Sequence, residues 1–318
     1  MNTDPSIARE SKVVLVPDGL DGERLDAALA RLLGLSRSVV VSLIDAGEVS
    51  SHGKKLAKSE KVSTDQYIEI LMPAPKAPPS LQATPIDGLK VIYDDADVIV
   101  IDKPAGIAAH PSPGWTGATV IGAIIAAGYQ VSTSGAAERQ GIVHRLDVGT
   151  TGLMVVAKNE NSYSHLKQQF RDRTVHKIYH ALVQGHMDPS EGTIDAPIDR
   201  HPREDYRFAV VADGKPSITH YTALEFFPAV SLLEIELETG RTHQIRVHFS
   251  ALRHPLVGDV TYGADHTVSD RLEIRRPWLH AKKLSFIHPS SGERVEFQTE
   301  YPADLTRSLQ ILSEHPQL

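Results

Sequence analysis

The loop formed by residues 141–153 carries the carboxylate that is best placed for chemistry. Asp147 follows the apolar pair Ile142-Val143 and precedes two glycines and two threonines within residues 149–152. Backbone donors of such a loop can approach a carboxylate closely, so the loop could hold a reactive acid. The alternative is an aspartate that only accepts hydrogen bonds from turn amides, as loop aspartates commonly do.

A second segment, residues 177–183, has the alternation of a β-strand. The period of two places Lys177 and Tyr179 on one face and Ile178 and His180 on the other. Tyr179 could stack on a nucleobase. It could equally be a strand tyrosine whose hydroxyl group lies in water.

A third segment, residues 238–248, reads as the end of a strand, a glycine turn and the start of a helix that Thr242 could cap. Arg241 emerges at the turn. An arginine within about 4 to 6 Å of a carboxylate favours the ionised form of that acid, so Arg241 is a candidate partner for Asp147. The alternative is an arginine on the rim of the domain.

Metal and nucleotide cofactors are not expected. The chain has sixteen histidines but no cysteine. His243 and His248 stand five residues apart, a spacing that would place them on different faces of either a helix or a strand and so does not favour a shared metal ion. Neither the glycine-rich loop of nucleotide-binding proteins nor the dinucleotide-binding fingerprint occurs. The sequence therefore predicts chemistry without a cofactor and without a metal site.

The charge distribution is uneven. The formal net charge is −7, which by itself argues against a nucleic-acid partner. Residues 139–183 nevertheless hold seven basic side chains against three acidic ones, and residues 54–61 hold four lysines against one glutamate. Each cluster could be a solvated charged face or a surface that meets phosphates.

The composition predicts a folded, soluble, cytoplasmic protein. Hydrophobic residues make up 41% and charged residues 23% of the 318 residues, values near the globular average. No apolar run approaches the roughly 18 residues of a membrane span, and residues 1–12 lack the apolar stretch of a signal peptide. The absence of cysteine fits a reducing compartment.

A proline-rich stretch divides the chain. Five of the twenty prolines lie between residues 73 and 85, where no periodic pattern occurs. We therefore expect an N-terminal tail at 1–18, a small module at 19–72, a linker at 73–86, a catalytic domain at 87–310 and a C-terminal tail at 311–318.

The small module is predicted to contain two short helices and a small sheet. Its segments Arg24-Leu25-Asp26, Leu35-Ser36-Arg37-Ser38, Ala46-Gly47-Glu48-Val49 and Gly53-Lys54 resemble the S-four-like (alpha-L) RNA-binding fold of a small-subunit ribosomal protein. The resemblance covers residues 20–72 and implies that Arg37, Lys54 and Lys55 face RNA phosphates. His52 departs from the asparagine that the family usually has before the Gly-Lys turn.

The larger part is predicted to be α+β, with a mixed, mainly antiparallel sheet and flanking helices. Strand patterns dominate it, for example at 98–101, 177–183 and 233–237, and they do not alternate regularly with crossover helices.

The motifs of the larger part, taken in order, resemble those of the RluA-type pseudouridine synthases, and most closely the RluD-like branch that carries the small RNA-binding module. The matching segments span about residues 90–300 and are Asp97 to Gly106 with His110-Pro111, His144 to Asp147, Lys177 with Tyr179, Arg200-His201-Pro202, Gly214-Lys215-Pro216 with Thr219-His220-Tyr221, Gly240 to His248, Gly258-Asp259 with Tyr262-Gly263, and Leu279-His280-Ala281.

The resemblance implies an isomerisation in which the uracil is detached from the ribose at N1 and rejoined through C5. Asp147 would be the nucleophile or base, with the atom that it attacks left open; Arg241 would be its basic partner, and Tyr179 would stack on the base and assist removal of the C5 proton. Arg145 would fill the gap left by the flipped uridine, a role that suits a planar guanidinium. His144 and Lys177 would also contact RNA.

The implied partner is structured RNA, in particular the 23S-type large-subunit ribosomal RNA or its assembling particle, bound by a monomer that does not associate with membranes. Val148-Gly149 and Phe208 replace residues that are often charged in the family, so these RNA contacts would be less basic than in many relatives.

Two other classes remain as alternatives. A non-catalytic RNA-binding or ribosome-assembly factor would use the same fold without the acid. A hydrolase would need a second carboxylate to protonate the leaving group, and no such partner is evident in the motifs.

Overall fold

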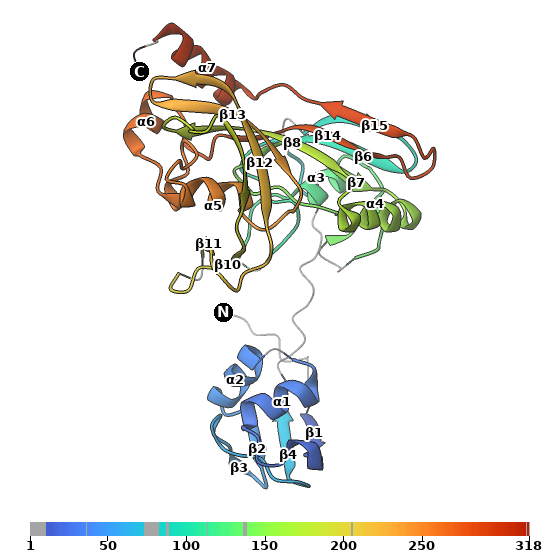
Figure 1. Ribbon diagram of the computed structural model, residues 1–318. Coiled ribbons are helices and arrows are strands. Elements are labelled where there is room, and N and C mark those ends of the chain that lie inside the picture. The colour runs from blue at the N-terminus through green and yellow to red at the C-terminus, as the bar shows by residue number, and fades with distance from the viewer. Residues whose placement is uncertain are drawn as a thin grey trace. The chain divides into compact units, whose positions relative to one another are not determined.

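The computed structural model describes residues 11–35, 37–72, 83–86, 89–112, 114–135, 139–204, 206–315 and 317. The chain forms two compact units, residues 1–78 and 79–318 (Figure 1). Most of the predicted linker, and Ser36 as a possible helix cap, lie outside the described residues. Among the helices that are described, none has the length and apolar character needed to cross a membrane.

The smaller unit packs two helices on a four-stranded sheet. The helices are α1 (Leu25–Leu33) and α2 (Arg37–Asp45), preceded by the short 3-10 helix η1 (Asp18–Leu20). The sheet has the order β1-β4-β2-β3, with β1 (Ser11–Leu15), β4 (Tyr67–Leu71), β2 (Val49–Ser51) and β3 (Lys54–Lys55).

Strand β1 lies in the segment predicted to be a tail. Its five residues pair antiparallel with β4, so the module begins before residue 19. Alternation in β4 buries Ile68 and Ile70 completely, and α1 buries Leu29 on the same core. Strand β1 is therefore part of a unit that has its own hydrophobic core.

The larger unit is built on one mixed sheet. Its main path runs β5-β6-β7-β14-β8-β13-β12-β9, and β15 pairs with β14. The pair β7/β14 is parallel, whereas the other pairs are antiparallel. The strands are β5 (Lys90–Asp94), β6 (Val98–Lys103), β7 (Thr151–Ala157), β8 (His176–Gln184), β9 (Glu191–Asp195), β12 (Ile218–Phe227), β13 (Val230–Leu237), β14 (Leu279–Ile287) and β15 (Arg294–Gln298).

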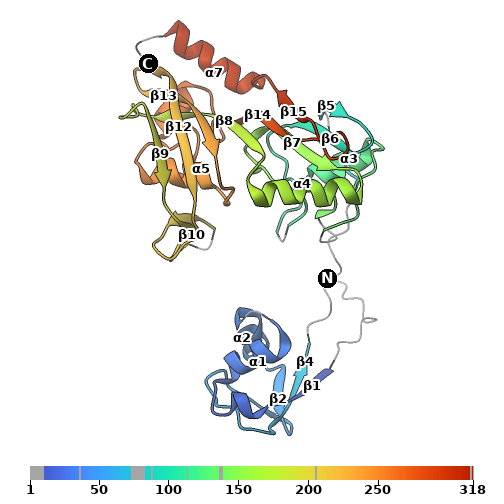
Figure 2. The ribbon, with the colours of Figure 1, turned by 45° about the vertical axis from the view of Figure 1, so that its right-hand side comes forward.

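Helices and a small hairpin flank this sheet. They are α3 (Val120–Ala126), α4 (Glu160–Asp172), α5 (Gln244–Ala251), η3 (Val260–Tyr262), α6 (His266–Arg271), α7 (Ala303–Glu314) and the hairpin β10 (Ile198–Arg200) with β11 (Phe208–Val210). In Figure 2, α3 and α4 accompany one end of the sheet, while α5 and the hairpin accompany the other.

The predicted α+β class with a mixed, mainly antiparallel sheet is thus confirmed. Helix α7 continues beyond residue 310, where the catalytic domain was expected to end.

The central strand β7 is buried on both faces. Met154 and Val156 join one hydrophobic core with Ile121 of α3, whereas Leu153 and Val155 join a second core with Leu166 of α4. A strand that is covered on both sides provides a rigid support for the loop that leads into it, which contains Asp147.

Candidate active site

A pocket of about 100 Å³ opens beside Asp147. Four chain segments contribute to it: the loop before β7, strand β8, the first residue of β14, and the region from the end of β13 into α5. The lining residues are Arg145, Leu146, Asp147, Thr150, Tyr179, Leu237, Gly240, Arg241, Thr242, His243, Gln244, Ile245, Arg246 and Leu279. Asp147, Tyr179, Arg241 and Arg145, four of the predicted site residues, therefore meet at one place.

Asp147 is held by its backbone and by one carboxylate oxygen. Its carbonyl oxygen accepts a hydrogen bond from Thr150 N at 3.0 Å, which closes the turn. Its Oδ2 lies 3.3 Å from Arg246 Nη1 and 3.8 Å from His243 Nε2. The carboxylate side chain retains 18% exposure and lines the pocket, so a ligand can reach it.

Arg246 contacts two carboxylates, and its bonds to Asp259 hold it in position beside Asp147. Its Nε and Nη2 donate to the two oxygens of Asp259 at 2.6 and 2.9 Å, and its guanidinium lies 4.8 Å from the ring centre of Tyr262. Burial opposes the charge, but the hydrogen bond and the charge of Asp259 raise the pKa of Arg246 above its ordinary value. The arginine is therefore a fixed cation that stabilises the ionised form of Asp147.

The predicted pairing of Asp147 with Arg241 needs correction, because Arg246 makes this ion pair. Arg241 Nε donates to Pro216 O at 3.2 Å, which holds its side chain at the pocket wall. The local reason is that the helix begins at Gln244 rather than at Thr242. Gln244 Oε1 accepts from Arg241 N at 3.0 Å, so the turn is fixed at Arg241, three residues before the first residue of the helix.

Sequence reasoning missed Arg246 although it quoted the segment that contains it. An arginine inside a helix, between the buried residues Ile245 and Val247, could have indicated a buried ion pair. The Gly258-Asp259 motif supplies the matching acid thirteen residues later.

Tyr179 lies on the pocket wall with 7% of its surface exposed. Burial, and secondly the negative charge of Asp147, raise the pKa of Tyr179 above its ordinary value. Its hydroxyl is consequently neutral in the physiological range. The next residue, His180, contacts Tyr301 on the other side of the sheet, as the predicted alternation requires.

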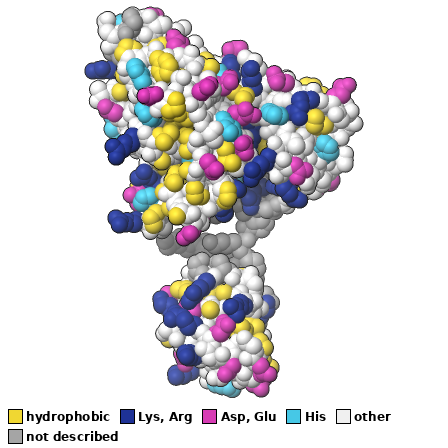
Figure 3. All heavy atoms as spheres, in the orientation of Figure 1, with side chains coloured by type: hydrophobic (Ala, Val, Ile, Leu, Met, Phe, Trp, Pro, Cys, Tyr) yellow, Lys and Arg dark blue, Asp and Glu magenta, His cyan; other side chains and the backbone are white. Residues whose placement is uncertain are grey.

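A basic groove of about 410 Å³ adjoins the pocket and shares Arg145, Tyr179 and Arg241 with it. Arg171, Arg173 and Lys177 also line it. Figure 3 shows Lys and Arg side chains gathered beside α4 on this unit. Burial, and secondly Arg173, lower the pKa of Lys177 to about 8, against the opposing charge of Glu236.

His144, which was predicted to contact RNA, is occupied by internal contacts. Its Nε2 accepts from Val155 N at 3.0 Å, and its ring stacks on Phe170 at 4.6 Å between ring centres. Burial lowers the pKa of His144 to about 3. The neutral ring therefore fixes the loop next to Arg145, and its Nε2 is not free to bind RNA.

A buried lysine, which the sequence analysis did not select, supports the same loop. Lys103 is fully buried, and its Nζ donates to Pro104 O and Ile107 O at 2.9 Å and to Val148 O at 3.3 Å. Burial lowers the pKa of Lys103 to about 7, although the charge of Asp147 opposes this shift. The bond to Val148 ties the residue after Asp147 to β6.

The smaller unit carries the other three predicted RNA contacts. Lys54 and Lys55 are exposed on β3. Arg37 is also exposed, but its Nη2 donates to Asp26 Oδ2 at 2.9 Å, so its guanidinium already has an internal partner. The prediction that Arg37 faces phosphate must therefore be qualified by this ion pair.

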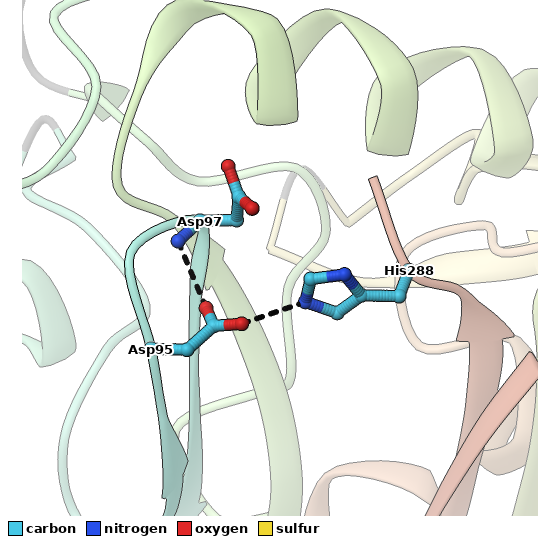
Figure 4. Close-up of side chains that lie close together, drawn as sticks. All are labelled: Asp95, Asp97 and His288. Atoms are coloured by element: carbon cyan, nitrogen blue, oxygen red, sulfur yellow. Dashed lines mark hydrogen bonds and ion pairs between the residues drawn. The ribbon is translucent and has the colours of Figure 1, made fainter. Parts of the chain in front are cut away.

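A separate cluster joins Asp95, Asp97 and His288, as Figure 4 shows. Asp95 Oδ1 accepts from the backbone N–H groups of Asp97 and Val98 at 2.8 Å, and Oδ2 lies 2.9 Å from His288 Nε2. Asp97 Oδ1 accepts from Asn159 and Ser162. These bonds engage the carboxylates in the turn that precedes β6, which gives the cluster a structural role.

Comparisons with known proteins agree with this geometry. The sequence profile of the RNA pseudouridylate synthase family matches residues 97–251. An uncharacterized RNA pseudouridine synthase of Mycobacterium bovis is 55% identical over 299 residues, which cover 93% of this chain and 96% of that protein. The ribosomal large subunit pseudouridine synthase D of Nitrosomonas europaea is 42% identical, over 95% of this chain and 88% of its own length.

The fold also has a solved counterpart. The structure of human RNA pseudouridylate synthase domain containing 1 is 30% identical in sequence, with a TM-score of 0.55, and the match covers 71% of this chain and 87% of the human chain.

Proposed function

The chain belongs to the RNA pseudouridine synthases, and from this we propose that it converts uridines of large-subunit ribosomal RNA into pseudouridine, with Asp147 as the reactive acid. The observation that carries the proposal is an accessible carboxylate, held by a buried arginine, in a pocket that opens into a basic groove. The RNA class rests on the relative from Nitrosomonas europaea, whose name assigns it to the large ribosomal subunit.

The reaction needs only what the pocket offers. The bond between uracil N1 and ribose C1′ breaks, the base turns, C5 joins C1′ and loses its proton, and N1 takes up a proton, so the product has the same atoms as uridine. Neither oxidation nor transfer of an external group occurs, so no cofactor is required. Asp147 supplies the nucleophile or base, and Arg246 Nη1, 3.3 Å from its Oδ2, holds the carboxylate in place beside the pocket.

The surrounding residues have separate tasks. Tyr179 stacks on the turned base, and its neutral hydroxyl lies on the pocket wall where the C5 proton must leave. Arg145 lines both cavities and is exposed, which suits a side chain that replaces the flipped nucleotide in the RNA stack. Lys177, Arg171 and Arg173 attract the phosphates along the groove.

The same residues argue against the hydrolase alternative. Among the described residues that line the pocket, Asp147 is the only carboxylate, whereas glycosidic hydrolysis by a carboxylate pair needs two. The non-catalytic alternative fails to account for a carboxylate that is kept accessible beside an arginine clamp.

We further propose that the enzyme works as a monomer in the cytoplasm. The acid, its arginine and the stacking tyrosine that the proposed reaction uses all lie within the larger unit, residues 79–318. The proposed substrate is made and assembled in the same compartment.

Mapping pseudouridine in ribosomal RNA from cells with and without the gene tests the proposal. We expect one or more large-subunit sites to lose a pseudouridine-specific chemical label, and the wild-type gene to restore it. Mass spectrometry on purified enzyme and RNA adds the chemical distinction, because isomerisation leaves the RNA mass unchanged while hydrolysis releases a base. Unchanged labelling in the deletion strain, together with inactive purified protein, would contradict the proposal.

A further inference from the structure

A chain of three contacts runs from the hairpin β10–β11 to Asp147. Phe208 N, at the start of β11, donates to Tyr262 Oη at 3.1 Å. Tyr262 Oη lies 2.8 Å from His243 Nδ1, and His243 Nε2 lies 3.8 Å from Asp147 Oδ2. His243 therefore stands between a buried tyrosine and the reactive carboxylate.

The first two contacts determine which ring nitrogen of His243 carries the hydrogen. The phenol oxygen of Tyr262 accepts the Phe208 N–H and has a single hydrogen to donate. In the described part of the chain, Tyr262 Oη has only Phe208 N and His243 Nδ1 as hydrogen-bond partners. Tyr262 is 3% exposed, so a hydroxyl hydrogen without an acceptor would be costly, and it must go to Nδ1.

The consequence for the other nitrogen is direct. When Nδ1 of a neutral imidazole accepts a hydrogen bond, the ring hydrogen is on Nε2. This Nε2–H group lies 3.8 Å from Asp147 Oδ2, the same oxygen that accepts a hydrogen bond from Arg246 Nη1 at 3.3 Å. At 3.8 Å the contact is longer than a hydrogen bond, so His243 acts on Oδ2 through the partial positive charge of its Nε2–H group, beside the hydrogen bond from Arg246.

The ring of His243 is held from several sides. Phe208 and Tyr262 contact it edge-on, with ring centres at 5.7 and 5.6 Å. Its backbone has φ 57°, in the left-handed region, which a residue with a β-carbon adopts only at an energetic cost. Such a conformation persists where the surroundings require it.

The environment also keeps the imidazole neutral. Burial lowers the pKa of His243 below its ordinary value, and Arg246 and Arg145 act in the same direction, while Asp147 and Asp259 oppose them. A neutral donor orients the carboxylate without adding a second full positive charge beside it.

We propose that His243 is a positioning residue for Asp147, and that Tyr262, held by the hairpin β10–β11, fixes its ring as the Nε2–H tautomer. The proposal rests on the proposed function because it takes Asp147 as the reactive group. The proposal gives the hairpin a role in positioning Asp147. The hydrogen bond from Phe208 N holds Tyr262, and the hydroxyl of Tyr262 fixes the tautomer of His243.

The first test is spectroscopic and independent of activity. Long-range ¹H–¹⁵N correlation spectra of the full-length protein distinguish the two neutral tautomers of a histidine, and the His243→Asn variant identifies the His243 signals by their absence. We expect the Nε2–H pattern in the wild type and a loss of this preference in Tyr262→Phe. A wild-type His243 in the Nδ1–H form would overturn the proposal, whether or not the enzyme makes pseudouridine.

The second test uses saturating kinetics on an RNA stem-loop that the wild type converts. Tyr262→Phe retains the ring beside Arg246 and should lower kcat by about tenfold, with KM changed less than about twofold, as expected for a misoriented catalytic group. Tyr221→Phe is the matched control, because Tyr221 is a buried tyrosine whose hydroxyl donates to Pro189 O. It should leave kcat and the His243 spectrum unchanged.

A pair of substitutions at His243 covers the case in which Tyr262→Phe folds poorly. Gln places an amide N–H group near the position of Nε2 and so keeps a polar hydrogen facing Asp147. Asn tolerates the left-handed backbone but has no donor that reaches the carboxylate. We expect His243→Gln to be the more active of the two. Equal activity, or a more active Asn variant, would mean that His243 serves only the backbone turn, and would contradict the proposal.

Discussion

Both units of the protein contain an aspartate held by arginine, but the burial of the two partners is reversed. In the smaller unit, the Asp26 side chain is 4% exposed, whereas its partners Arg24 and Arg37 are 49% and 58% exposed. In the larger unit, the partner Arg246 is 9% exposed and Asp147 is 18% exposed.

The difference separates a structural carboxylate from the one that we propose to be reactive. Asp26 is hidden behind two surface arginines: Arg24 bonds it within the first turn of α1, and Arg37 joins it to the start of α2. Asp147 is presented to a pocket by an arginine that a second, almost fully buried carboxylate, Asp259, holds in place. A ligand can reach the carboxylate only in the pair whose arginine, rather than its carboxylate, is the more buried partner.

The largest effect is expected from Arg246→Lys. Lysine keeps the charge but cannot bridge Asp259 and Asp147 with the fixed geometry of a guanidinium. Pseudouridine formation at saturating RNA should fall by about 10³-fold, as for the loss of a preorganised electrostatic group. Arg241→Lys, at the neighbouring position on the pocket wall, is the control and should lose less than about tenfold. A more severe defect in Arg241→Lys would reverse our assignment.

Tyr179→Phe tests the tyrosine that lines the pocket beside Asp147, a kind of residue that the ion pairs of Asp26 do not involve. The ring for stacking remains, so RNA affinity should change less than about twofold, while product formation should slow by about 10²-fold if the hydroxyl assists proton removal. Rapid-quench measurements of the label separate these effects. Wild-type rates in this variant would restrict Tyr179 to stacking.

Removing residues 1–80 tests whether the two units are separable. Each unit has its own hydrophobic core, so the truncated protein should fold and act on a short stem-loop at a rate close to wild type. On whole ribosomal RNA at limiting enzyme, activity should fall by about 10²-fold because a tethered binding surface is lost. Loss of activity on both substrates by a folded domain would show that the module belongs to the active site.

The smallest effect is expected from Asp26→Asn, which should destabilise the module by about 1.5–3 kcal/mol, the range for hydrogen bonds to a charged group. Hydrogen exchange of α1 amides in the full-length protein measures this change. Asp45→Asn is the control, because Asp45 pairs at 3.4 Å with the exposed Lys58. Equal effects of the two substitutions would contradict a structural role for Asp26.

The pH dependence of the module's stability should distinguish wild-type Asp26 from the Asn variant. The hydrogen bond from Arg24, with help from Arg37 and against burial, lowers the pKa of Asp26 from 3.8 to about 2. Its contribution to stability is therefore complete above pH 3.8 and is lost as the pH falls toward 2. The Asn variant should lack this part of the acid transition.

The sequence analysis could propose site residues where they stand in a local pattern. The local pattern made Asp147 and Tyr179 candidates, the family resemblance implied their roles, and the structure places both on one pocket. The partner of Asp147 was not identified, because Arg246 is 99 residues distant and only the packing of α5 brings it near. His144 was assigned to RNA for the same reason, since its stacking on Phe170 is a tertiary contact.

Comparing Asp147→Asn with Asp26→Asn on one short RNA stem-loop that the wild type converts tests the central claim most directly. Both substitutions remove one negative charge and keep the side-chain shape. We predict no pseudouridine from pure Asp147→Asn, with RNA binding preserved within about tenfold, and a wild-type yield from Asp26→Asn. Turnover by Asp147→Asn, once deamidation back to aspartate is excluded, would contradict the account.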